Sequence, residues 1–202
     1  MSDLLYEEHG LAAGELPSAP LLVDSGRFVF FIGLALDVIF FGTFTAGYFF
    51  LRSSAPAWPP ADLPHLHPSM IGASTICIAV ATALLALTVF AQNRNSLRSM
   101  RASLMLALLF LAGFLVLNAT EWRELIVTGL PIRTVFGGIY FVLTGLFHLH
   151  IAASMVYTLS KYRWTLRWRR YTRSAASIAH LSYFMDAMLI VWLGIYYVIY
   201  LS

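Results

Sequence analysis

Long apolar runs recur along the chain, and short polar segments separate them. The runs occupy residues 28–50, 69–91, 102–120, 136–159 and 178–201. Each is about 19–24 residues long, and roughly 20 residues are needed to cross the hydrocarbon core of a bilayer as a helix. No strand-like alternation of apolar and polar residues competes with this pattern. The sequence therefore predicts an all-α, polytopic membrane protein with five transmembrane helices in a bundle.

The composition supports this class. Of the 202 residues, 59% are hydrophobic and 11% are charged, whereas about a quarter of the residues of a soluble domain are charged. The single cysteine, Cys77, lies inside the second run, where we expect it to fill space as a small apolar side chain. A lone cysteine excludes an internal disulfide and a metal site built from cysteines.

The segment before the first run differs from the rest of the chain. Residues 1–26 contain several acidic residues together with proline and glycine. The first run that follows is too long for the apolar part of a signal peptide. We therefore expect an acidic cytoplasmic N-terminal arm at residues 1–26 and a five-helix transmembrane domain at residues 27–202.

Basic residues are concentrated in the second and fourth segments between the runs. The positive-inside rule places both segments in the cytoplasm, with the N-terminus inside and the C-terminus outside a bacterial-type inner (plasma) membrane. Because the fourth segment lies between two spans, we expect its arginines to bind anionic phospholipid headgroups rather than nucleic acid. These arginines include Arg163, Arg167, Arg169 and Arg170.

Two carboxylates lie inside apolar runs. At ~1.5 Å per residue, Asp37 is about 14 Å and Asp186 about 12 Å from the cytoplasmic ends of their helices. A carboxylate facing lipid at mid-depth costs about 2.5–3.5 kcal/mol on insertion scales. Each should therefore face protein, water or a polar headgroup, or carry a proton. The sequence leaves two interpretations open, a hydrogen-bonded packing residue or a role in proton supply or lipid docking.

The fourth run contains two histidines, His148 and His150. They are two positions apart, about 200° around a helix, so they point to different faces. Two ligands for one ion on one helix need a spacing of three or four. We therefore predict no metal or haem bound by this chain. No spacing singles out a nucleophile with its base or a phosphate-binding glycine loop, which is typical of an accessory subunit rather than an enzyme acting alone.

Several short motifs follow one another in a characteristic order. The first run carries Asp37 ahead of a Phe-Phe pair, and Trp58-Pro59-Pro60 follows it. The third run ends in Asn118-x-x-Glu121-Trp122, the fourth contains Thr144-Gly145 and His150 in the pattern T-G-x-x-x-x-H, and the fifth contains Asp186. In this order the chain, after residue 25, resembles subunit III of the haem–copper respiratory oxidases.

The resemblance implies a helix bundle with a lipid-holding cleft that packs on the catalytic subunit I, with subunit II and further subunits nearby. The family's subunit III binds no haem or copper itself; these belong to the partner subunit, and phospholipids are its structural ligands. It implies a subunit of a cytochrome c or quinol oxidase without a catalytic centre of its own, which stabilises subunit I and supports proton and oxygen supply. Asp37 would lie near the lipid cleft, and Glu121, His150 and Asp186 would form a polar interior. Together with His148, these residues are the candidates for proton handling or for lining the lipid cleft.

Departures from the family pattern keep other functions open. Residue 147 is Phe where the family has its first histidine, and His148 comes one place later. Asp at position 37, with five spans, is similar to quinol oxidases and to the accessory subunit of nitric oxide reductases, whereas Trp58-Pro59-Pro60 favours cytochrome c oxidases. An independent small transporter that uses Asp37 as a coupling site is the alternative from another class.

Overall fold

The computed structural model describes residues 21–58, 68–130, 132–167 and 175–201. These residues form two compact units, which divide inside the first helix between Ala35 and Leu36. The helices are α1 (Leu21–Ser54), α2 (Pro68–Asn93), α3 (Leu97–Val127), α4 (Val135–Arg167) and α5 (Ala175–Tyr196), and a π-helical turn, η2 (Tyr197–Leu201), continues α5. Five helices of the described residues are long and apolar enough to cross a membrane. The prediction of an all-α, polytopic membrane protein is confirmed.

The helices extend beyond the apolar runs that predict them. α3 begins five residues before its run and α4 continues to Arg167, eight residues past its run. Polar and basic side chains tolerate these positions because their long stems reach the membrane interface while their backbone stays helical. α1 begins at Leu21, so residues 21–26 of the expected arm are helical, and residues 1–20 lie outside the described part of the chain.

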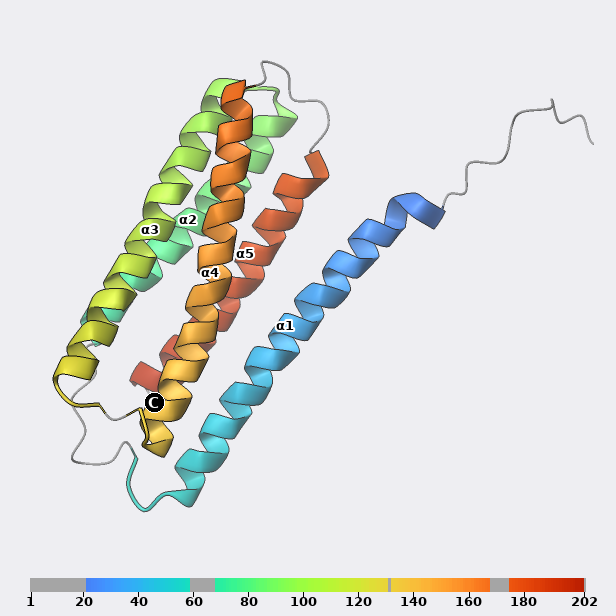
Figure 1. Ribbon diagram of the computed structural model, residues 1–202. Helices are drawn as coiled ribbons and strands as arrows, with labels where there is room; N and C mark the ends of the chain where they lie inside the picture. The colour runs from blue at the N-terminus through green and yellow to red at the C-terminus, as the bar shows by residue number, and fades with distance from the viewer. Residues whose placement is uncertain (1–20, 59–67, 131, 168–174, 202) are drawn as a thin grey trace, which may run out of the picture. The chain divides into compact units, whose positions relative to one another are not determined.

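Residues from Leu36 onward hold the packed core. In Figure 1, α2 to α5 run side by side; α2 packs against α3 and α5, and α4 packs against α3 and α5. Trp192 of α5 is fully buried, with its ring centroid 4.9 Å from that of Phe114 and 4.8 Å from that of Phe147. Its indole N–H donates to the Thr75 hydroxyl at 2.9 Å. Trp192 therefore joins all four helices, through ring contacts to α3 and α4 and a hydrogen bond to α2.

A glycine turn ends α3 and controls how α4 begins. Gly129 has φ +95°, a conformation that favours glycine. The Leu130 N–H donates to the Leu125 carbonyl at 2.8 Å and the Gly129 N–H to the Ile126 carbonyl at 3.3 Å, the pattern of a Schellman helix end. The chain thus reverses within a few residues, which brings the end of α3 beside the start of α4.

Candidate functional site

The buried carboxylate of Glu121 links three elements, α3, α4 and η2. Glu121 of α3 is fully buried. The Tyr140 hydroxyl donates to Glu121 Oε2 at 3.0 Å, and the Tyr200 hydroxyl donates to the same oxygen at 2.8 Å. The two tyrosine hydroxyl oxygens are 2.8 Å apart. Hydrogen bonds to this carboxylate therefore offset the cost of burying it.

Trp122, the next residue of α3, packs against the Thr144-Gly145 pair of α4. Its indole N–H donates to the Thr144 hydroxyl at 3.2 Å, and that hydroxyl donates to the Tyr140 carbonyl at 2.7 Å. A Cβ added at Gly145 would lie 3.0 Å from Cη2 of Trp122. The ring therefore occupies the space that any side chain at position 145 would need, and two motifs far apart in the sequence form one contact between helices.

His148 lies among aromatic rings. Its ring centroid is 5.2 Å from that of Trp122, 5.8 Å from that of Phe114 and 6.2 Å from that of Trp192. Its Nε2 is buried and has no hydrogen-bond partner among the residues that the structure describes. This environment is that of a packing side chain rather than that of a metal ligand.

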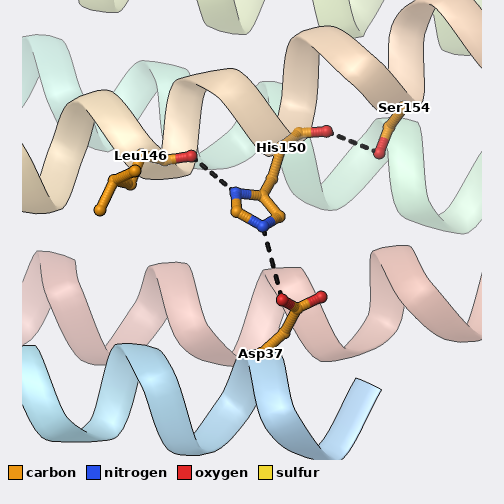
Figure 2. A network of polar contacts seen from close by, with 4 residues as sticks. All are labelled: Asp37, Leu146, His150 and Ser154. Carbon is orange, nitrogen blue, oxygen red and sulfur yellow. Dashed lines mark hydrogen bonds and ion pairs between the residues drawn. The ribbon is translucent and has the colours of Figure 1, made fainter. Parts of the chain in front are cut away.

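His150 faces a different side of α4 and meets Asp37 of α1 (Figure 2). Its Nε2 is 3.6 Å from Asp37 Oδ1, and its Nδ1 is 2.7 Å from the Leu146 carbonyl oxygen. The two side chains remain 23% and 32% exposed, respectively. Figure 2 also shows the Ser154 hydroxyl donating to the His150 carbonyl oxygen at 2.9 Å.

The contact with Leu146 determines which face of a neutral His150 ring Asp37 meets. A carbonyl oxygen only accepts, so Nδ1 of His150 must donate to Leu146. A neutral ring then presents the lone pair of Nε2 to Asp37, and an ionised carboxylate would oppose it. The contact is attractive when one further proton is present, either on Nε2 or on the carboxyl group.

Aromatic side chains hold this pair in place. Phe41, one turn after Asp37, is buried, and its ring centroid is 5.3 Å from that of His150 and 6.0 Å from that of Phe147. Phe184 of α5 stacks on His150 with centroids 6.4 Å apart. Three helices thus shield the imidazole from most directions.

Trp58 packs against the C-terminal part of α1. Its indole N–H donates to the Tyr48 hydroxyl at 2.9 Å, and its ring centroid is 5.3 Å from that of Phe136 at the start of α4. Pro59 and Pro60, the rest of the motif, lie outside the described residues. Arg163 and Arg167 are exposed near the end of α4, whereas Arg169 and Arg170 also lie outside the described part of the chain.

Asp186 is not brought together with the other predicted site residues. It is exposed on α5, whereas the resemblance implied a polar interior shared with Glu121 and His150. The reason is the rotation of α5, because Met185, Met188 and Trp192 occupy its inward face with no exposed surface. Among the described residues no group of three or more His, Cys, Asp or Glu side chains could hold a metal ion.

Comparisons with known proteins find relatives along most of the chain. Over 184 residues the chain is 26% identical to a probable cytochrome c oxidase subunit 3 of Mycobacterium leprae, covering 90% of this chain and 88% of that protein. The cytochrome c oxidase subunit 3 of Corynebacterium diphtheriae is 28% identical over 187 residues, with the same coverage. The chain is thus similar to subunit III of cytochrome c oxidases over nearly its whole length.

A third relative has a different extent. The haem–copper oxidase subunit I+III of Aeropyrum pernix is 28% identical over 158 residues, which are 72% of this chain. The match covers 19% of the Aeropyrum protein, about one fifth of its length. No family model matches the chain.

Two residues of the candidate site were not singled out by the sequence. Tyr140 and Tyr200 donate to Glu121, but tyrosines are common near span ends and carry no motif of their own. A signal for them did exist. Because successive spans alternate in direction, the end of the third run, the start of the fourth and the end of the fifth lie at the same end of the bundle, where Glu121 needs donors.

Proposed function

We propose that the chain is the non-catalytic subunit III of a haem–copper terminal oxidase, which reduces oxygen to water and pumps protons in aerobic respiration. One observation carries this proposal: relatives named cytochrome c oxidase subunit 3 align with 90% of this chain and with 88% of their own length. The Aeropyrum relative, whose name joins subunits I and III, supports subunit I as the direct partner. Subunit II and further subunits complete the assembly, and haem and copper belong to the partner.

The contribution of this chain is a scaffold with a proton-holding pair. Asp37 and His150 lie well inside their spans and contact one another there. A pair of this kind supports proton supply to a neighbouring subunit. The Glu121 cluster and the Trp122–Gly145 contact fix α3 against α4, so the surface offered to subunit I stays constant during turnover.

We also propose where lipid binds to the chain and how the chain is oriented in the membrane. Arg163 and Arg167 are exposed at the basic end of α4, where anionic phospholipid headgroups would bind. The second and fourth interhelical segments would face the cytoplasm, which places the N-terminus inside and the C-terminus outside the inner membrane. A lipid-filled cleft that also serves as an oxygen route is the part of the proposal taken from the resemblance.

Replacing Asp37 by Ala tests the role of the pair. In the purified complex we expect unchanged haem spectra but faster loss of activity during turnover. The rate of loss should rise by about threefold, because a polar contact between membrane helices contributes about 0.6 kcal/mol on average. Repeated oxygen-electrode traces at saturating donor measure this rate.

The matched control is Thr43→Val, in the same helix, because the Thr43 hydroxyl donates to the Ile39 carbonyl of its own helix. It should leave the rate of inactivation unchanged. His150→Ala should reproduce Asp37→Ala, and the double variant should lose no more than either single variant. A change of haem content in Asp37→Ala would contradict the assignment, since this residue would then support the redox centre directly.

A nitric oxide reductase subunit is the second candidate, favoured by Asp rather than Glu at position 37. The gas that the purified complex consumes separates the two. Oxygen consumption without nitric oxide reduction supports the oxidase. Nitric oxide reduction without oxygen consumption supports the nitric oxide reductase instead.

A further inference from the structure

One face of α5 is apolar, exposed and interrupted by a carboxylate. The α5 face consists of Tyr183, Asp186, Ile190 and Leu193 of α5, continued by Tyr197, the first residue of η2, and all five are exposed within the unit formed from Leu36 onward. The spacing of the four α5 residues, three, four and three, places them within an arc of about 80° at ~100° per residue. The opposite side of α5 carries the buried residues that face α2 and α4.

The carboxylate of Asp186 indicates that this face needs a partner group. Within the described part of the chain, no side chain forms a hydrogen bond or ion pair with it. It lies nine residues after the start of the span Ser177–Leu201, about 13 Å along the helix at ~1.5 Å per residue. Ionisable residues at such depth face a protein interior or a partner group rather than lipid tails.

Lipid headgroups and a second copy of this chain both fit the α5 face poorly. Lipid headgroups lie beyond the ends of the span, and the short side chain of Asp186 cannot reach across about 13 Å to them. A second copy of this chain inserts with the same orientation, so a two-fold contact would place both Asp186 carboxylates at the same depth facing one another. Like charges at close range disfavour their ionised forms and hence that contact.

We propose that the α5 face docks against a transmembrane helix of another subunit, and that this helix carries a basic side chain (Lys, Arg or His) at the level of Asp186. The face has the three-four spacing with which helices pack side by side at a shallow angle. Gly194 adds room for close approach, since nothing lies within 4 Å of a Cβ placed there. Ile190 and Leu193 supply apolar contact next to the ion pair.

The inference rests on the proposed function, because it requires a membrane complex around this chain. It goes further by assigning a surface and the chemistry of its partner.

Site-specific photo-crosslinking in the intact complex tests the assignment. The photoreactive amino acid p-benzoylphenylalanine replaces Tyr197, and crosslinked peptides are identified by mass spectrometry. We expect a crosslink to one transmembrane segment of another subunit that contains Lys, Arg or His. Asp186→Leu should lower this crosslink by about fivefold or more, and Asp186→Glu should preserve it. Leucine inserts into a membrane more favourably than aspartate, so poor insertion would not explain the loss.

The same reagent at Leu149, which is 64% exposed on α4, is the control. Its crosslinking pattern should not change with Asp186→Leu. Crosslinks from Tyr197 to lipid alone or to a second copy of this chain, or a crosslink that Asp186→Leu leaves unchanged, would overturn the assignment. A haem spectrum of the same sample tests the proposed function separately, because a preparation without a haem–copper subunit contradicts that function whatever α5 contacts.

Discussion

Replacing Glu121 by Ala should lower the free energy of unfolding by about 3 kcal/mol, one of the two largest effects of a single substitution that we expect in this chain. The substitution removes the shared acceptor of two tyrosine hydroxyls and leaves a cavity between α3, α4 and η2. A buried donor that loses its acceptor costs about 1–3 kcal/mol, and the cavity adds to that cost. Unfolding of the detergent-solubilised protein by sodium dodecyl sulfate, followed by circular dichroism, measures the change.

Glu124→Ala is the matched control, one turn further along α3 and exposed. It should change the free energy of unfolding by less than about 0.5 kcal/mol. Glu121→Gln, which keeps the volume and one acceptor oxygen, should fall between the two. Equal effects of Glu121→Ala and Glu124→Ala would show that the cluster does not stabilise the bundle.

Gly145→Leu should destabilise the protein by about 2–3 kcal/mol, because the new side chain overlaps the Trp122 ring. Even the first added carbon would lie 3.0 Å from Cη2 of that ring. Overpacking of this kind forces side chains from their rotamers and shifts the backbone, which typically costs about 1–3 kcal/mol. The same unfolding titration measures it.

Gly47→Leu provides the comparison, since nothing lies within 4 Å of a Cβ at Gly47. This variant should be neutral or slightly stabilising, because glycine is a poor helix former. Adding Trp122→Ala to Gly145→Leu should cost less than the two single changes together, as the ring and the new side chain compete for one space. Strict additivity would contradict the contact.

The sequence predicts the five spans well because length and apolarity alone decide them. It predicts the ends of the helices less well, since basic and aromatic residues are compatible with both helix and loop at a membrane interface. Asp37 and His150 were both singled out, and their distances from the ends of their spans allow them to meet. Their pairing depends on the rotation of each helix.

The sequence could not predict how each helix is rotated about its own axis. Membrane helices that are apolar on nearly all sides have no strong polar face to orient them. The resemblance grouped His150 with Glu121 and Asp186. In the structure His150 contacts Asp37, and Glu121 accepts hydrogen bonds from two tyrosines. Asp186 is exposed. Motif order therefore located the polar residues along the chain, and packing decided which of them are partners.

The most direct measurement is the haem and copper content of the chain with and without its partners. Isolated from native membranes in mild detergent through a C-terminal tag, the protein should come with a large membrane subunit, and that preparation should contain haem and copper. After dissociation of the subunits, the tagged chain should contain neither. Haem or copper that stays bound to the separated chain, or its recovery from native membranes without any haem-containing partner, would contradict the account.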